Sequence, residues 1–386
     1  MAGVADPKGP HDRGPTAAAA TALREGALVI LPTETVYGVF GGARHPGVIG
    51  TLRAARERVG SAPAAPLTWH APDAAPALEA LGVGGPIAKH VTEKLAPGPV
   101  RFLVELEPAA MTRALAALGV PAGVIDDGDA VHVRVPDADT TREVLRRADA
   151  GPIVGERVGL LGLGDGRELP ADARNIAEGA GVRAVINEGP TRLGRPSTTI
   201  RLTREGWYRV ESVGALSEED VRRRVEKMVL FVCTGNTCRS PMATAIARHY
   251  FSRHGAALVP TRVESAGVSA YDGDAMTPDA AEALRALRVD PGRHRSRPLT
   301  RAMIDEADHI FVMTKAHAKR ITDVAPEAAG KVEVLDPSGR DVADPMGGSA
   351  NDYHAAAEQI AEHVKRRLTD LGLLRLPARK GVMEAG

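Results

Sequence analysis

The chain has 386 residues, more than a single hydrophobic core usually organises, so its length favours two domains. Lys and Arg together number 49, as do Asp and Glu, and this balance gives no sign of binding to nucleic acid or to an acidic membrane surface. Hydrophobic residues make up 44% of the sequence, as in ordinary globular proteins. No run of about 18 apolar residues occurs, which excludes a transmembrane helix.

The cysteine content indicates a reducing compartment. The only cysteines are Cys233 and Cys238, which do not make the disulfide framework of a secreted protein. We therefore expect a cytoplasmic protein that does not associate with a membrane. Residues 1–16 are rich in Gly, Pro, Asp and Lys and predict a disordered tail, not a signal peptide. The sequence leaves the oligomeric state open.

Residues 17–215 predict an α/β domain, because short apolar runs alternate there with helical segments rich in Ala, Leu and Arg. The clearest runs span residues 27–31, 101–105 and 131–135. Residues 216–227 open with Ser217 and three acidic residues, the pattern of a helix N-terminus. We expect this segment to be a helical connector.

Residues 228–386 predict a second domain in which strands and helices alternate. The first strand spans residues 228–233, and a helix runs from Pro241 to about residue 254. The other expected strands are 262–264, 308–313 and 331–335, and the other expected helices are 278–287, 316–324 and 353–371. Four strands with intervening helices predict a small, parallel, doubly wound sheet.

The loop between the first strand and the first helix carries the chemistry. Residues 233–241 have the sequence Cys-Thr-Gly-Asn-Thr-Cys-Arg-Ser-Pro. Backbone N–H groups of such a loop and the N-terminus of the following helix bind a tetrahedral oxyanion, and Arg239 offers a bidentate fork for two phosphoryl oxygens. The same positive field favours a thiolate at Cys233, which can attack phosphorus in line and form a phosphocysteine intermediate. The alternative is that Cys233 is only a small buried side chain at a strand end.

The other residues of the loop are candidates for binding the phosphate or the substrate. Gly235 permits close backbone approach, and Asn236 is one of the few non-glycine residues that tolerates a left-handed backbone. Cys238 either packs inside the loop or forms a reversible disulfide with Cys233 that protects the nucleophile. The full candidate set is Thr234, Gly235, Asn236, Thr237, Cys238 and Ser240.

A phosphatase also needs an acid that protonates the leaving group and later activates water. Asp344 is the candidate, because it precedes a proline in the Gly-rich segment 341–353. An Asp-Pro pair alone is an ordinary turn signal. Its catalytic interpretation depends on Cys233.

These motifs resemble the low-molecular-weight protein-tyrosine phosphatases over residues 228–373, through segments 229–243, 265–267 and 344–345. The bacterial protein-arginine phosphatase branch is also similar in residues 294–300, in Met313-Thr314 and in the Asp-Pro-x-Gly-Gly-Ser sequence. That branch has threonine at the position of Thr237, whereas tyrosine-specific relatives usually have a bulky aliphatic residue there and aromatic residues after the Asp-Pro pair.

The resemblance implies a phosphatase that needs no cofactor and no metal and acts on phosphorylated proteins. A small hydroxyl at Thr237 can admit and hydrogen-bond a planar guanidinium, and Asp344 can pair with that group while protonating the P–N nitrogen. We therefore expect phosphoarginine ahead of phosphotyrosine. Arsenate reductases share this loop but use further cysteines that the chain lacks, which makes a redox enzyme the weaker alternative.

The N-terminal half resembles the threonylcarbamoyl-AMP synthase (YrdC-like) family, which has an open, twisted α/β sheet. The matching segments are 27–38, 56–58, 66–70, 97–99, 133–136 and 196–199. That family uses threonine, bicarbonate and ATP with Mg²⁺ to make threonylcarbamoyl-adenylate for a tRNA modification. The resemblance implies that the ligand-binding residues are Thr33, Thr35, Tyr37, Arg56, Arg58, His70 and Ser197. Alternatively, Arg56 and Arg58 are solvated charges on an arginine-rich helix.

The N-terminal half departs from that family at two places. Where the family shows Ser-x-Asn after an apolar strand, residues 151–157 have the sequence Gly-Pro-Ile-Val-Gly-Glu-Arg, and Arg101 replaces a usual threonine. Two alternatives remain. The half is a working synthase, which would make the chain bifunctional with the synthase as its main activity, or it only binds nucleotide or RNA and targets the phosphatase. The missing motif favours the second.

Overall fold

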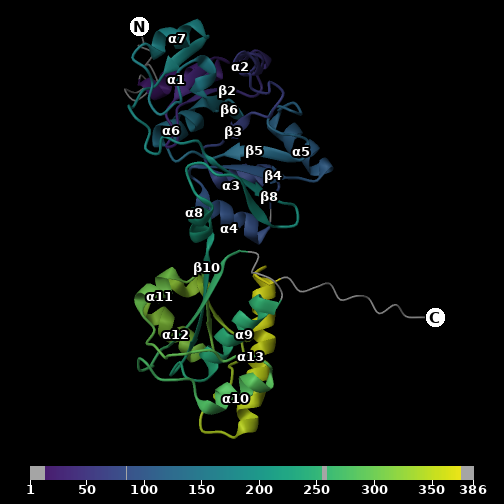
Figure 1. Ribbon diagram of the computed structural model, residues 1–386, viewed down its shortest axis with the longest axis vertical. Coiled ribbons are helices and arrows are strands. Elements are labelled where there is room, and N and C mark those ends of the chain that lie inside the picture. The colour runs from purple at the N-terminus through teal and green to yellow at the C-terminus, as the bar shows by residue number, and fades with distance from the viewer. Residues whose placement is uncertain (1–13, 84, 254–258, 375–386) are drawn as a thin grey trace, which may run out of the picture. The chain divides into compact units, whose positions relative to one another are not determined.

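The computed structural model describes residues 14–83, 85–253 and 259–374. The chain forms two compact units, one ending at Arg224 and the other beginning at Val225 (Figure 1). Most of the tail expected over residues 1–16 lies outside the described residues, while Pro15 and Thr16 already belong to the first helix. Within the described ranges, no helix combines the length and the apolar character that crossing a membrane requires.

The N-terminal unit alternates strands with helices, as its hydrophobic pattern predicts. Its strands are β1 (Leu28–Leu31), β2 (Gly38–Gly42), β3 (Thr68–His70), β4 (Val100–Glu105), β5 (Ala130–Arg134), β6 (Ile153–Arg157), β7 (Val182–Val185), β8 (Thr198–Leu202) and β9 (Tyr208–Ser212). Its helices are α1 (Pro15–Arg24), α2 (Pro46–Arg58), α3 (Ala74–Ala80), α4 (Pro86–Leu95), α5 (Pro108–Leu118), α6 (Asp139–Ala148), α7 (Ala173–Gly179) and α8 (Glu218–Val225), with a 3-10 turn η2 (Val158–Leu161).

The nine strands of this unit form one mixed sheet in the order β7-β1-β2-β6-β3-β5-β4-β8-β9. The pairs β1–β7, β3–β5 and β4–β8 are parallel, and the pairs β1–β2, β2–β6, β3–β6, β4–β5 and β8–β9 are antiparallel. Helices α1 and α6 cover a core in which Leu23, Leu31 and Val144 are buried. The open α/β sheet expected for this half is confirmed.

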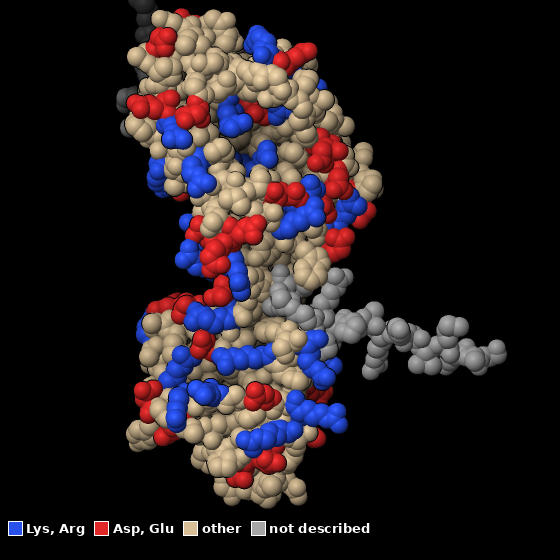
Figure 2. All heavy atoms as spheres, viewed as in Figure 1, with Lys and Arg blue, Asp and Glu red and all other residues tan. Residues whose placement is uncertain are grey.

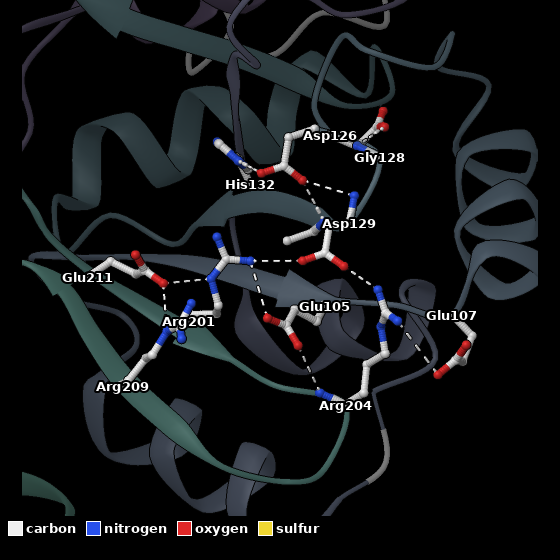
Figure 3. A network of polar contacts seen from close by, with 12 residues as sticks. Glu105, Glu107, Asp126, Gly128, Asp129, His132, Arg201, Arg204, Arg209 and Glu211 are labelled. Carbon is white, nitrogen blue, oxygen red and sulfur yellow. Dashed lines mark hydrogen bonds and ion pairs between the residues drawn. The ribbon is translucent and has the colours of Figure 1, made fainter.

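A network of ion pairs holds the β4–β8–β9 edge of this sheet (Figure 3). The guanidinium of Arg201 on β8 donates to Glu105 at 3.3 Å, to Asp129 at 3.2 Å and to Glu211 at 2.6 Å. The Arg201 side chain is only 13% exposed. Three carboxylates therefore compensate one largely buried arginine on this face of the sheet.

The C-terminal unit has fewer strands, and all of them are parallel. Its strands are β10 (Lys227–Cys233), β11 (Thr261–Gly267), β12 (His309–Val312) and β13 (Val332–Val334). Its helices are α9 (Arg239–Arg253), α10 (Pro278–Ala286), α11 (Arg301–Glu306), α12 (Lys315–Val324) and α13 (Ala350–Asp370), with a 3-10 turn η3 (Pro326–Lys331). The sheet order is β11-β10-β12-β13, so the expected parallel, doubly wound sheet is confirmed.

Helices α9, α10 and α13 lie together on one face of this sheet, and α11 and α12 lie on the other (Figure 1). On the first face the rings of Phe231 and Phe311 are 6.0 Å apart, and the guanidinium of Arg367 from α13 lies 5.2 Å from the Phe311 ring. On the second face Leu230 and Ile310 pack in an aliphatic core. With both faces covered, β10 is fully buried and only its carboxyl end is open for chemistry.

Three helices differ from the expectation. Helix α13 begins at Ala350, three residues before the expected start at residue 353. Helix α9 begins at Arg239, two residues before Pro241, because Arg239 and Ser240 already have helical geometry. Helix α11 was not predicted, although Thr300 caps it by accepting a hydrogen bond from the Met303 N–H at 3.3 Å.

Figure 2 shows acidic and basic side chains interspersed over the visible face of each unit, as their equal numbers lead one to expect.

Candidate active site

Cys233 is the last residue of β10, and β10 lies between β11 and β12. The chain runs from β10 to β11 on one side and reaches β12 on the other, so the carboxyl end of β10 is the point where ligands bind in such sheets. Residues 233–240, called here the cysteine loop, curl from this end into the N-terminus of α9. Asn236 has a φ of 56°, the left-handed conformation expected for it.

Two hydrogen-bond donors converge on the sulfur of Cys233. The Asn236 backbone N–H donates to Sγ at 3.3 Å, and the Ser240 hydroxyl lies 3.0 Å from the same atom. The Asn236 side-chain amide donates to the Ser240 oxygen at 2.9 Å. The Ser240 hydroxyl also lies 3.4 Å from the Ala266 carbonyl, so its proton has two acceptors within reach, Sγ and that oxygen. A hydrogen bond donated to the sulfur of a cysteine favours the nucleophilic thiolate form.

Gly267 allows the backbone of β11 to lie close against the cysteine loop. A Cβ atom on Gly267, at the end of β11, would lie 2.5 Å from the carbonyl oxygen of Thr234 and 2.9 Å from the backbone nitrogen of Asn236. Both contacts are with backbone, which cannot give way as a flexible side chain would. The Ser265-Ala-Gly267 segment therefore ends in the one residue type that permits this close approach.

Two histidines also hold the cysteine loop. His294 opens the segment 294–300 that carries the family resemblance, whereas His317 does not stand out in the sequence. His294 donates from Nε2 to the Asn236 carbonyl at 2.6 Å. His317 on α12 bridges Thr234 at 3.0 Å and Thr314 at 2.9 Å through its two ring nitrogens. Burial lowers the pKa of His317, and the Arg239 charge lowers it further, which keeps the ring neutral. A neutral ring has one donor and one acceptor, so this bridge has a defined direction.

Arg239 and Asp344 meet beside the cysteine loop. The Arg239 guanidinium is buried, donates to the Val342 carbonyl at 3.0 Å and forms an ion pair with Asp344. The Asp344 side chain is 45% exposed and lies in the segment that precedes α13. Its second oxygen accepts the Met346 N–H at 3.3 Å. The structure thus brings the three predicted catalytic residues, Cys233, Arg239 and Asp344, to one end of the sheet.

The remaining residues of the cysteine loop differ in exposure. Thr237 is half-buried, and its carbonyl accepts the Thr277 N–H at 3.0 Å. The Cys238 sulfur lies 3.4 Å from the Thr277 hydroxyl and 3.8 Å from the Tyr353 hydroxyl. Both cysteines are free thiols, and Cys238 packs against α10 and α13 side chains. In this structure Cys238 therefore packs inside the loop and does not form a disulfide with Cys233.

An exposed aromatic side chain occurs in the segment that follows β11. Tyr271 is 82% exposed in the segment after β11, where the Ser269 N–H donates to the Thr234 carbonyl at 2.9 Å. The segment after Asp344 contains no aromatic side chain before Tyr353, which is buried. The segment after Asp344 therefore lacks aromatic residues before Tyr353, as expected.

The N-terminal unit contains a polar cavity of about 330 Å³. Of the predicted ligand-binding residues, it brings together Thr33, Tyr37, Arg56, His70 and Ser197. Thr35 does not line the cavity, but the Thr35 hydroxyl lies 2.8 Å from the hydroxyl of Thr33, which does. The cavity also takes residues that were not predicted, namely Arg101, Arg134, Glu156, Arg157 and Thr199.

Arg56 and Arg58 lie in different surroundings. Arg56 is buried at the cavity, forms an ion pair with Glu156 and donates to the Pro66 carbonyl at 2.9 Å. Arg58 is exposed and does not line the cavity. Residues two positions apart on a helix point to different sides, so only one of the pair can reach the site. Arg58 is therefore a solvated charge on the helix, as in the alternative interpretation. It does not lie with the other predicted ligand-binding residues.

His70 is a neutral residue in the wall of this cavity. Burial lowers its pKa to about 3, and the Arg134 charge acts in the same direction. Its Nδ1 lies 3.0 Å from the Thr68 carbonyl, an acceptor only, so Nδ1 carries the proton and Nε2 is an acceptor.

Comparison with known proteins decides the family of the C-terminal unit. Residues 228–373 match the family model described as low molecular weight phosphotyrosine protein phosphatase. A protein-arginine-phosphatase of Geobacillus stearothermophilus is 36% identical over 142 residues, which are 36% of this chain and 91% of that protein. The chain belongs to the low-molecular-weight phosphatase family. It carries a cysteine-dependent protein phosphatase of this family in its C-terminal unit.

Other relatives of the phosphatase unit have two kinds of name. A protein-arginine-phosphatase of Bacillus subtilis is 37% identical and matches over 36% of this chain and 92% of its own length. A low-molecular-weight protein-tyrosine-phosphatase of Escherichia coli, Wzb, is 34% identical over 27% of this chain and 66% of its own length. Residues 21–210 match the Sua5/YciO/YrdC family model, described as telomere recombination, which confirms the resemblance of the N-terminal unit.

Proposed function

We propose that the phosphatase unit hydrolyses phosphoarginine on proteins through a phosphocysteine intermediate at Cys233. The surroundings of the Cys233 sulfur carry this proposal: the Asn236 N–H and the Ser240 hydroxyl face it at the N-terminus of a helix that begins with Arg239. These groups favour the thiolate, the nucleophilic form of cysteine. The free thiols also agree with a cytoplasmic location, which we propose for the protein.

The proposed reaction has two displacements at phosphorus. In the first, Cys233 Sγ forms the S–P bond, the P–N bond breaks with its electron pair on nitrogen, and Asp344 gives that nitrogen a proton. In the second, water attacks phosphorus while Asp344 takes its proton, and the S–P bond breaks to restore the thiolate. Arg239 binds two phosphoryl oxygens throughout. Its ion pair with Asp344 places the acid beside the phosphoryl group.

Three observations favour phosphoarginine over phosphotyrosine. Thr237 is small and half-buried, so it leaves room for a planar guanidinium at the mouth of the loop. The rim after Asp344 carries Met346 and two glycines in place of aromatic rings. Two of the relatives are named protein-arginine-phosphatases. Tyr271 is the observation that favours phosphotyrosine, because an exposed ring can stack on an aryl phosphate.

The Thr237→Ile variant tests this preference. The added bulk and the lost hydroxyl should lower the ratio of kcat/KM for a phosphoarginine peptide to kcat/KM for a phosphotyrosine peptide by about tenfold or more. Phosphate release from matched peptides measures the ratio. Thr237→Val, which removes the hydroxyl at nearly constant size, separates the two causes. An unchanged ratio in both variants would remove Thr237 from the specificity of the site.

For the N-terminal unit we propose ligand binding without turnover. Arg56, which the family resemblance makes a triphosphate ligand, is already paired with Glu156. Residues 151–157 also lack the Ser-x-Asn sequence of the family. These two departures favour binding over turnover, and tRNA modification is not the role that we propose.

The synthase alternative gives a clear expected result. Full-length protein mixed with ATP, Mg²⁺, threonine and bicarbonate should release no pyrophosphate above the rate without threonine. A folded N-terminal unit, shown by circular dichroism and by its own unfolding transition, is the control. Pyrophosphate release that requires both threonine and bicarbonate would restore the bifunctional alternative.

A further inference from the structure

Thr234 is the one exposed residue of the cysteine loop, since the other residues of 233–240 are buried or half-buried. The Thr234 carbonyl accepts the Ser269 N–H at 2.9 Å, which fixes the loop backbone to the segment after β11. The Thr234 hydroxyl lies 3.0 Å from Nε2 of His317, which comes from α12. The backbone and the side chain of Thr234 are therefore held by two different elements at the mouth of the loop.

The His317 ring joins Thr234 to a second hydroxyl, that of Thr314. Thr314 is the N-cap of α12, and its oxygen accepts the His317 backbone N–H at 3.3 Å and lies 2.9 Å from His317 Nδ1. A neutral imidazole donates from one nitrogen and accepts at the other, so two arrangements are open. In the first, Thr314 donates to Nδ1 and Nε2–H donates to Thr234. In the second, Thr234 donates to Nε2 and Nδ1–H donates to Thr314.

Burial decides between the two arrangements. In the second, the Thr314 proton has no acceptor among the described residues, although Thr314 is half-buried. In the first, the unpaired proton is that of Thr234, which is exposed. A donor left unpaired inside the protein costs more than one at the surface, where water or a ligand accepts its proton. The first arrangement is therefore favoured, and it leaves the Thr234 proton available at the mouth of the loop.

The charges around His317 do not reverse this direction. Burial lowers the pKa of the ring most, and the Arg239 charge lowers it further. Asp344 and Asp341 oppose this effect, while Arg320 on the same helix adds to it. The ring is therefore neutral at neutral pH. A protonated ring would also donate from Nε2, so the Thr234 oxygen accepts from His317 in both states.

We propose that the Thr234 hydroxyl donates a hydrogen bond to a main-chain carbonyl of the phosphorylated protein, and that His317 positions this hydroxyl. The proposal rests on the phosphoprotein hydrolysis proposed above, but not on which residue is phosphorylated. The phosphoryl group binds deeper, at Cys233 and Arg239, which are both buried. An exposed hydroxyl at the mouth of the loop faces the chain that carries the phosphorylated side chain. Every such chain offers carbonyl acceptors, so the contact needs no particular sequence.

Thr234→Val tests this contact, because it removes the hydroxyl at nearly constant size. The substrates are a phosphoarginine peptide, the matching phosphotyrosine peptide, and 4-nitrophenyl phosphate, which has no peptide carbonyl. For whichever peptide the wild type hydrolyses, the ratio of its kcat/KM to that of 4-nitrophenyl phosphate should fall about three- to tenfold, as for the loss of one neutral hydrogen bond. The loss should lie in the KM of the peptide, because the carbonyl takes no part in the reaction.

Two variants of His317 test its positioning role. His317→Ala should lower the same ratio, and adding it to Thr234→Val should lower the ratio no further, because His317 acts through that hydroxyl. His317→Gln should restore most of the ratio, since its amide can place an N–H near the position of Nε2. His317 is buried, so thermal unfolding of each variant shows whether the fold is intact. A purely structural role would not give this rescue.

Thr322→Val is the matched control. It makes the same change on the same helix, α12, but the Thr322 hydroxyl bonds only to carbonyls of that helix, those of Ala318 and Lys319. Both its ratio and its rate with 4-nitrophenyl phosphate should equal those of the wild type.

Two results would overturn the proposal. One is an unchanged ratio in Thr234→Val, and an equal loss for peptide and 4-nitrophenyl phosphate would assign the hydroxyl to the phosphoryl group instead. The other is additive losses in Thr234→Val and His317→Ala, which would show that His317 does not act through Thr234. Both results leave the proposed function intact. Wild-type protein that hydrolyses 4-nitrophenyl phosphate but neither phosphopeptide would contradict that function and this contact together, so the two failures can be told apart.

Discussion

Replacing Cys233 with serine is expected to lower kcat for phosphoarginine peptides by about 10⁴-fold or more. A serine hydroxyl remains protonated at neutral pH, so the donors that favour a thiolate cannot make it a comparable nucleophile. Serine nearly matches cysteine in size, and the contacts with Asn236 and Ser240 can persist. The loss should therefore be chemical. Phosphate release under single-turnover conditions, with thermal unfolding to show an intact fold, measures it.

The second cysteine provides a matched control for this experiment. Cys238→Ser makes the same atomic change in the same loop, but the Cys238 sulfur faces Thr277 and Tyr353. We expect kcat to stay within about tenfold of wild type. Equal losses in both variants would show that the loop tolerates no serine, and equal rates in Cys233→Ser and wild type would end the proposed mechanism.

The phosphatase fold could be predicted because its signals are local. Strand, loop and helix follow one another within residues 228–254, and a buried strand that ends in a Cys-x5-Arg loop has few alternative geometries. The braces of the loop could not be predicted, because Gly267, His294 and His317 come from other elements. Gly267 reaches the end of β10 through parallel pairing with Cys233, His294 from the segment before α11 and His317 from α12, and nothing in their local sequence shows this.

The residues that line the N-terminal cavity could not be predicted from local signals. Its composition depends on the register of a nine-stranded mixed sheet, in which β5 lies between β3 and β4. In the sequence, Arg101 stands out only as a departure from a family, and Arg134 lies in a matching segment without a predicted role, although the two pair in register. Arg58 belongs to a family motif, but helical geometry turns its side chain away from the cavity. Long-range register is the information that a single sequence lacks.

The Asp344→Asn variant should separate the two proposed displacement steps, formation of the phosphocysteine and its hydrolysis. Asparagine can keep the contact with Arg239 but cannot give a proton to the leaving nitrogen, so kcat for a phosphoarginine peptide should fall about 10²–10⁴-fold. An aryl phosphate with a strongly acidic phenol leaves without that proton, and its rate of phosphocysteine formation should fall much less. Burst kinetics with the aryl phosphate measure formation and hydrolysis of the intermediate separately.

The second displacement gives this experiment its sharpest outcome. If Asp344 also activates the water, the aryl phosphate should still produce a burst in Asp344→Asn, followed by turnover slowed about 10²-fold or more. The intermediate would then accumulate on Cys233, where acid quenching and mass measurement detect one added phosphoryl group. Equal losses for both substrates, with no accumulated intermediate, would show that Asp344 acts through the charge that it places beside Arg239 and not as an acid or base. The ion pair seen here would then be its whole contribution.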